Sequence, residues 1–71
     1  MNKSTNSSRK VRDARVQAGL SQQELGDIVG RSKQWISELE RGNVKLGYDM
    51  AVLISKACNV STDYFASVQD L

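Results

Sequence analysis

The 71-residue chain contains no histidine, no proline and a single cysteine, and these absences exclude several kinds of site. Cys58 has no second cysteine with which to form an internal disulfide, and a zinc site would have too few ligands without histidine. A glycine-rich phosphate loop is missing, and the pattern shows no pair of buried acids. The sequence therefore predicts no catalytic residues, no metal and no cofactor, and we expect Cys58 to be a small core residue.

Long apolar runs are absent as well. No segment approaches the roughly 20 apolar residues of a membrane span, and residues 1–8 lack the apolar stretch of a secretory signal. The chain is 39% apolar and 25% charged, which is typical of a soluble globular protein. A length of 71 residues supports one domain, and we expect no second, ligand-sensing domain within it. We therefore expect a cytoplasmic protein that does not contact membranes.

The net charge of +2 is small, but positive residues are concentrated near the N-terminus. The first sixteen residues include five basic residues and one acidic residue, namely Lys3, Arg9, Lys10, Arg12 and Arg15 against Asp13. A basic segment of this kind is either solvated surface or a contact with the DNA backbone, where each neutralised phosphate releases counterions.

Residues 20–42 contain two short helical patterns joined by a four-residue turn centred on Gly30. Ser21 and Glu24 have the spacing of a capping box, which begins a helix at residue 22, and Gly30 ends it. The predicted apolar face of this helix consists of Leu25, Ile28 and Val29.

A second helix, over residues 33–41, begins after Ser32 as its N-cap. Its predicted buried stripe consists of Trp35, Ile36 and Leu39. Its exposed face carries Ser32, Lys33, Gln34, Ser37, Glu38 and Arg41. These side chains can bond base edges and phosphates, as a helix in the DNA major groove requires. A two-helix hairpin on any small bundle would also have a polar outer face, so the pattern alone leaves both interpretations open.

The remaining pattern predicts three more helices and no strand, so the fold class is all-α with five helices. The first helix is capped by Ser7 or Ser8 and runs to about Ala18, with Val11, Ala14, Arg15 and Ala18 on one face. After a loop over residues 43–47, a fourth helix runs from Tyr48 or Asp49 to Cys58, ended by Asn59. Its inward face is predicted as Tyr48, Ala51, Val52, Ile54, Ser55 and Cys58. Ser61 caps a fifth, with Val60, Tyr64, Phe65, Val68 and Leu71 as its apolar set. We expect a flexible arm over residues 1–7 and one domain over residues 8–71.

The order of residues 21–42 also closely resembles a known family. Ser-Gln-Gln-Glu-Leu, then Val-Gly, then Gln-Trp-Ile-Ser-Glu-Leu-Glu-Arg-Gly is similar to the helix-turn-helix of the lambda Cro and repressor family, also called the XRE family. The resemblance implies a lambda-repressor-like domain that binds double-stranded DNA sequence-specifically and regulates transcription, with repression the expected sign. The chain departs from the family at Gly26, where alanine is usual, and at Leu46, near a frequent proline. We expect Gly26 to weaken its helix by roughly 0.5–1 kcal/mol relative to alanine.

Roles for individual residues follow from the resemblance and from side-chain chemistry. Base contacts are expected from Ser32, Lys33, Gln34 and Glu38. Backbone contacts are expected from Gln22, Arg31, Ser37, Arg41, Asn43 and Lys45. Gln34 can bond adenine and Lys33 can donate to guanine, so these two are the main specificity candidates. Glu38 either accepts from cytosine, repels phosphate, or pairs with Arg41 or Lys45. Trp35 is expected to pack against the preceding helix or along the backbone.

Arg15 shares an apolar helix face and therefore needs a partner, because an unpaired buried charge is very costly. In the family, an arginine here commonly pairs with the glutamate that closes the recognition helix, which is Glu40 in this chain. The resemblance thus implies a structural ion pair between Arg15 and Glu40.

Apolar residues late in the chain allow two interpretations. Met50, Leu53, Tyr64, Val68 and Leu71 either close the small core or form a two-fold dimer interface, which the family commonly builds from its fourth and fifth helices. A homodimer would place two recognition helices ~34 Å apart on a pseudo-palindromic operator. Three alternatives stay open: the antitoxin of a toxin-antitoxin pair, with a toxin as protein partner, the controller protein of a restriction-modification system, and the DNA-binding domain of a longer repressor.

Overall fold

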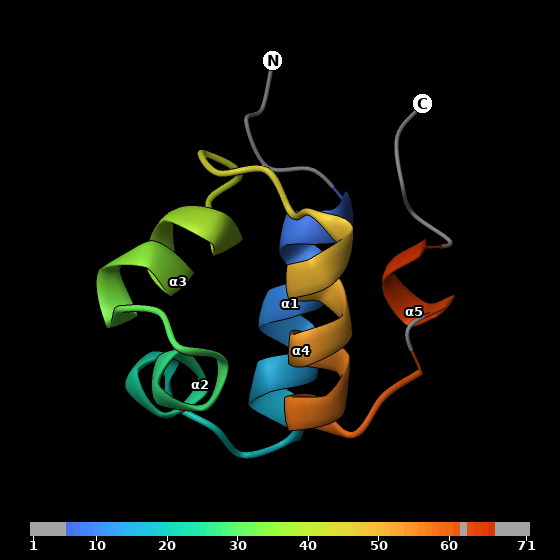
Figure 1. The fold of residues 1–71 in the computed structure, drawn as a ribbon, viewed down its shortest axis with the longest axis horizontal. Coiled ribbons are helices and arrows are strands. Elements are labelled where there is room, and N and C mark those ends of the chain that lie inside the picture. Colours follow the sequence, from blue (N-terminus) through green and yellow to red (C-terminus); the bar gives the residue numbers. More distant parts are fainter. Residues whose placement is uncertain (1–5, 62, 67–71) are drawn as a thin grey trace.

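The computed structural model describes residues 6–61 and 63–66, and over these residues all regular structure is helical (Figure 1). The helices are α1 Asn6–Gln17, α2 Gln22–Val29, α3 Lys33–Glu40, α4 Tyr48–Cys58 and a single turn, α5 Asp63–Ala66. The predicted all-α fold class is confirmed. Within the described part of the chain, no helix has the length and apolar character needed to cross a membrane.

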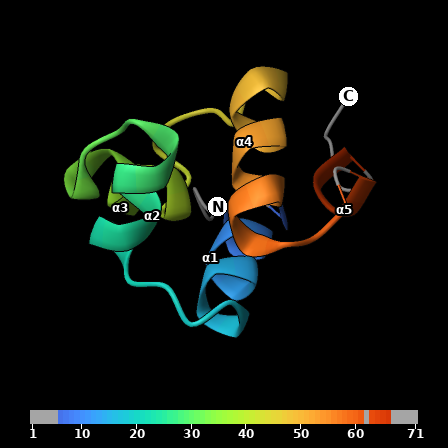
Figure 2. The ribbon, with the colours of Figure 1, turned by 60° about the horizontal axis from the view of Figure 1, so that its bottom comes forward.

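Two central helices separate the other three. α1 and α4 contact each other in the middle of the domain, and α2 and α3 pack together on one side of them (Figure 1). The short α5 contacts α1 and α4 on the opposite side, as both views show (Figure 2). This arrangement leaves α3 at the surface, at the end of the domain farthest from α5 (Figures 1 and 2).

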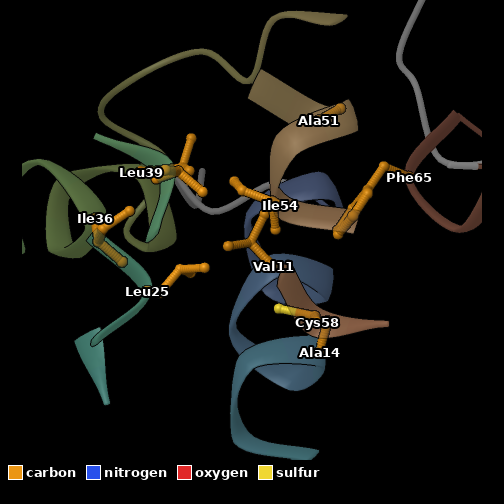
Figure 3. Packing of buried hydrophobic residues seen from close by; sticks show 10 residues of the cluster. Val11, Ala14, Leu25, Ile36, Leu39, Ala51, Ile54, Cys58 and Phe65 are labelled. Atoms are coloured by element: carbon orange, nitrogen blue, oxygen red, sulfur yellow. The ribbon is translucent and has the colours of Figure 1, made fainter. Parts of the chain in front are cut away.

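Side chains from all five helices meet in one hydrophobic core (Figure 3). Six of them are fully buried, namely Val11, Ala14, Leu25, Ile36, Leu39 and Ile54. Phe65 reaches this core from α5, and Cys58 is 5% exposed within it, which confirms the prediction that the cysteine is a core residue. Because the core takes side chains from both helices of the 20–42 segment, it fixes α2 and α3 relative to the rest of the domain.

Hydrogen bonds at the helix ends set the geometry of the α2–α3 pair. The Ser21 hydroxyl accepts from the Glu24 N–H at 3.0 Å, and the Glu24 carboxylate accepts from the Ser21 N–H at 2.8 Å, so the predicted capping box is present. Ser32 caps α3 by accepting from the Trp35 N–H at 3.0 Å. Gly30 ends α2 with a φ of +78°, a left-handed conformation that favours glycine. The turn therefore has three residues, 30–32, and not the predicted four, because α2 continues to Val29.

Gly26 is required by a close approach of the backbone. A β-carbon at this position would lie 2.5 Å from the Arg31 carbonyl oxygen, since the turn folds back onto α2. The Gly26 carbonyl accepts from the Arg31 N–H at 2.7 Å within the same contact. The expectation that alanine would be the better residue is therefore wrong, because it counted helix propensity and not the neighbouring turn.

Several predicted apolar positions face solvent instead. Ile28 is 57% exposed, because the buried arc of α2 runs through Leu25, Gly26 and Val29 and so turns Ile28 away from the core. Tyr48 is 72% exposed at the first position of α4, at the edge of the domain. Ala18 is exposed because α1 ends before it.

Neither serine predicted to cap the first helix is its N-cap. Ser7 and Ser8 both lie inside α1, which includes Asn6, and Ser8 is only 3% exposed. Of the predicted arm over residues 1–7, positions 1–5 lie outside the described residues, as do Val68 and Leu71 of the predicted fifth helix. At the other end of α4, Asn59 has the left-handed conformation of a C-cap with a φ of 59°, as predicted.

Candidate nucleic-acid interface

A surface depression of about 340 Å³ lies along the exposed side of α3 and reaches the first residue of α2. Its lining consists of Gln22, Lys33, Gln34, Ser37, Glu38 and Arg41. The α3 residues recur at one-turn spacing and so share one helix face. Most of the residues predicted to contact DNA therefore lie together on one surface, which we call the recognition face.

An exposed hydrogen-bonded cluster organises one end of the recognition face. Arg41 Nη1 donates to Glu38 Oε2 at 3.2 Å, and Asn43 Nδ2 donates to Glu38 Oε1 at 2.8 Å. Of the alternatives for Glu38, the pairing with Arg41 is present. Lys33 and Arg41 against Glu38 leave this face with an excess of one positive charge, which suits a polyanionic partner.

Ser32 lies directly before the recognition face, at the start of α3. Its hydroxyl oxygen accepts the capping bond from Trp35, while the hydroxyl hydrogen can still be donated. The side chain is exposed, so it combines a local structural role with the capacity for a further hydrogen bond.

Behind the recognition face, the predicted ion pair between Arg15 and Glu40 is present. Arg15 Nε donates to Glu40 Oε2 at 2.6 Å and Arg15 Nη2 donates to Glu40 Oε1 at 3.2 Å, which is a bidentate geometry. Arg15 Nη1 also donates to the Leu20 carbonyl at 2.9 Å. The pair thus ties α1 to the last residue of α3 and to the loop before α2.

Gln22 connects this ion pair to the surface. Its Nε2 donates to Glu40 Oε1 at 3.2 Å, and the same side chain lines the recognition face. An amide nitrogen has two N–H groups, so one stays available for a second acceptor. Gln22 is therefore held by a hydrogen bond to the Arg15–Glu40 pair, whereas a freely solvated residue at a helix start would have no such bond.

A second depression, of about 360 Å³, lies on another flank of α3. Its lining consists of Arg31, Trp35, Lys45, Gly47, Tyr48, Asp49 and Met50. The Arg31 guanidinium lies over the Trp35 ring, with Cζ 4.8 Å from the ring centroid. This pair is not among the sequence predictions, and the one signal for it is an arginine four residues before the single tryptophan, across the N-cap of α3.

Of the residues predicted for a dimer interface, Met50, Leu53 and Tyr64 belong to the described part of the chain, whereas Val68 and Leu71 lie outside it. Leu53 is 44% exposed on α4, whereas Met50 lines the second depression. Tyr64 is engaged within the domain, because Lys10 Nζ lies 4.5 Å from its ring centroid and Phe65 packs against it edge to face.

The thiol of Cys58 lies close enough to the Arg15–Glu40 pair to sense its charges. Burial raises the pKa of this thiol above its ordinary value, a shift that Arg15 opposes and Glu40 reinforces. A raised pKa keeps the group protonated at neutral pH, which agrees with a structural and not a reactive cysteine.

Comparisons with known proteins agree with this geometry. A family model described as helix-turn-helix matches residues 11–65, more than half of the chain. The fold is similar to that of the restriction-modification controller protein C.AhdI from Aeromonas hydrophila, with a TM-score of 0.79, 20% identity and coverage of 86% of this chain and 88% of that one. It is also similar to that of the clp gene regulator ClgR from C. glutamicum, with a TM-score of 0.75, 22% identity and coverage of 90% and 87%. A search of curated proteins gives no significant match. The family match and the α2–α3 geometry together place the chain in the helix-turn-helix family of DNA-binding transcriptional regulators, of the lambda Cro and repressor type.

Proposed function

We propose that the protein binds double-stranded DNA sequence-specifically in the cytoplasm, with α3 in the major groove, and that it represses transcription. The observation that carries the proposal is the recognition face, where side chains from the start of α2 and from α3 line one depression with an excess of positive charge. A helix-turn-helix presents the first turns of its second helix to base edges in this way.

Base contacts are proposed for Ser32, Lys33, Gln34 and Glu38, which lie on the first two turns of α3 or just before it. Gln34 can bond adenine through two hydrogen bonds, and Lys33 can donate to guanine. The proposed backbone contacts are Gln22, Arg31, Ser37, Arg41, Asn43 and Lys45, which together would supply affinity and not sequence preference.

Selection from random duplex DNA is the direct test of this function. The purified protein is mixed with random duplexes at moderate salt, and the retained molecules are sequenced. We expect enrichment of an inverted repeat with half-sites about one helical turn apart, the spacing for a two-fold dimer. Retention of no duplex by the folded protein would contradict the proposal, and enrichment of a lone half-site would contradict only the dimer.

The division between base and backbone contacts has its own test. Gln34→Ala is expected to cost about 1–3 kcal/mol on the selected site and to relax preference at one base pair. Arg41→Ala is expected to weaken binding to every duplex and to lower the slope of log affinity against log salt by about one. Lys56→Ala is the control, since it removes an exposed positive charge that lines neither depression. Equal effects of Gln34→Ala on selected and random DNA would contradict the division.

We further propose a homodimer that uses the exposed Leu53 on α4. Leu53→Glu is expected to shift the protein to a monomer in sedimentation experiments and to abolish preference for the inverted repeat over one half-site. Val16→Glu is the matched control, because Val16 is 56% exposed on α1 and is not part of the proposed interface. A variant Leu53→Glu that remains dimeric would place the interface elsewhere.

A restriction-modification controller is the second candidate role. It is favoured by the similarity to the fold of C.AhdI, because the match covers 86% of this chain and 88% of that one. The gene neighbourhood distinguishes the roles, because a controller is expected beside an endonuclease gene and an antitoxin beside a toxin gene.

A further inference from the structure

The second depression contains an aromatic residue that the proposed function does not use. Trp35 is the single tryptophan of the chain, and its side chain is half-buried against the core. One helical turn earlier, in the turn between α2 and α3, the exposed Arg31 lies with its guanidinium Cζ 4.8 Å from the Trp35 ring centroid. Because the core holds the Trp35 ring in place, the ring can in turn restrict the Arg31 side chain that lies over it.

The contact with the Trp35 ring leaves N–H groups of Arg31 available for a further acceptor. A guanidinium over an aromatic ring uses its face, whereas its N–H groups point outward in its plane. Among the described residues, the ion pairs are Arg15 with Glu40 and Arg41 with Glu38, so none of their carboxylates forms an ion pair with Arg31. Lys45 adds a second positive charge to the lining of the same depression, against the single acidic residue Asp49.

The position of this pair matters because a helix in the major groove lies between two sugar–phosphate backbones. Trp35 lies about 100° around α3 from Gln34, at the border of the recognition face. Arg31 and Lys45 line the second depression and not the depression of the recognition face, so both lie beside that face. A phosphate along one border of the groove is the chemical group that two cations at this place would recognise.

We propose that Trp35 is a positioning residue that holds Arg31 in place for a contact with a DNA phosphate. This inference rests on the proposed DNA binding and adds a role that the recognition face does not supply. An arginine in an exposed turn loses much rotamer freedom when it binds, and stacking on a fixed ring removes part of that loss before DNA arrives. Trp35 thereby increases affinity without touching a base.

The test is a double-mutant cycle measured with a 20-base-pair duplex of random sequence over a series of salt concentrations. Arg31→Ala is expected to weaken binding and to lower the log–log salt slope by about one. Trp35→Leu is expected to weaken binding about two- to fivefold, the effect of an exposed cation–π contact. In the Arg31→Ala background, Trp35→Leu is expected to have no further effect. Trp35→Phe keeps a ring and is expected to retain most of the affinity.

Each alternative gives a different result. If Trp35 only packs the domain, Trp35→Leu weakens binding equally with and without Arg31, which overturns the proposal while DNA binding stands. If the wild-type protein binds no duplex, the proposed function fails first and this inference fails with it. Should Trp35→Leu not fold, the fluorescence of Trp35 in the otherwise unchanged protein replaces it: DNA is expected to change the emission of the wild type and to change that of Arg31→Ala much less. Equal changes in both proteins overturn the proposal.

Discussion

Arg15 of α1 and Glu40 of α3 form a bidentate ion pair whose side chains are only 12% and 5% exposed, and Gln22 of the recognition face donates to the same carboxylate. The last residue of the recognition helix is thus held by two partners, one from the interior and one from the surface. Because α3 is only eight residues long, contacts at its final residue restrict the orientation of the whole helix together with its core residues.

Arg15→Met is expected to lower the free energy of unfolding by about 3–5 kcal/mol, because it leaves the buried Glu40 carboxylate with the neutral Gln22 amide and without its charged partner. The double variant Arg15→Met/Glu40→Leu is expected to recover much of this loss, since neither charge remains. Urea unfolding at neutral pH measures both. Arg12→Met, on the exposed side of α1, is the control and is expected to change stability by less than about 0.5 kcal/mol. A loss below about 1 kcal/mol for Arg15→Met would show that the pair does not hold α1 against α3.

Gly26→Ala is expected to destabilise the domain by about 1–3 kcal/mol, although alanine is the better helix former. The new β-carbon would meet the Arg31 carbonyl oxygen, a backbone atom that can move only if the turn before α3 shifts. Thermal unfolding compares this variant with Gly47→Ala, where a β-carbon meets nothing within 4 Å. An increase in stability for Gly26→Ala would mean that the turn relaxes freely.

The features that could be predicted from the sequence are those that depend on neighbouring residues. The capping bonds at Ser21 and Ser32 connect groups three residues apart, so the sequence pattern contains both partners. The ion pair of Arg15 with Glu40 spans 25 positions and was predicted only through the family resemblance.

Burial and close approach could not be predicted in the same way, because they depend on which element lies opposite. Ile28 has apolar spacing in α2 but turns away from the core, since the Arg31 backbone packs against Gly26 on the other side. Tyr48 begins α4 at the domain edge, where the described structure leaves it 72% exposed. For the same reason, the hydrogen bond from Gln22 to Glu40 could not be predicted from the sequence, because it depends on how α2 and α3 lie relative to each other.

The raised pKa of Cys58 predicts a loss of stability at alkaline pH. Burial favours the protonated thiol in the folded state, so this contribution is fully present below the unfolded pKa of about 8.5 and is lost as pH rises toward the folded pKa. The loss from this one group cannot exceed about 1.4 kcal/mol per pH unit. Urea unfolding at pH 7.5 and 9.5 measures how far the free energy of unfolding falls between the two pH values. This fall is expected to be smaller for Cys58→Ala than for the wild type. The same fall in both proteins would mean that groups other than Cys58 cause the loss of stability at alkaline pH.

Glu38→Gln distinguishes the remaining roles of the carboxylate on the recognition face. Arg41 and Asn43 both donate to it, so the charge is held beside the path proposed for DNA. Removing one exposed negative charge is expected to raise affinity for random duplexes about two- to fivefold, because repulsion from phosphates is lost.

The same substitution is expected to change the preferred base pair at one position of the selected site. A carboxylate accepts from the amino group of cytosine, whereas a glutamine amide bonds adenine. Parallel selections with the wild-type and Glu38→Gln proteins measure this, with Asp27→Asn as the control for loss of an exposed acidic residue outside both depressions. Higher affinity for random duplexes together with an unchanged selected site would mean that Glu38 acts only by repelling phosphates. A changed site would assign it to base reading, in which case its bonds to Arg41 and Asn43 serve to aim the carboxylate at its base.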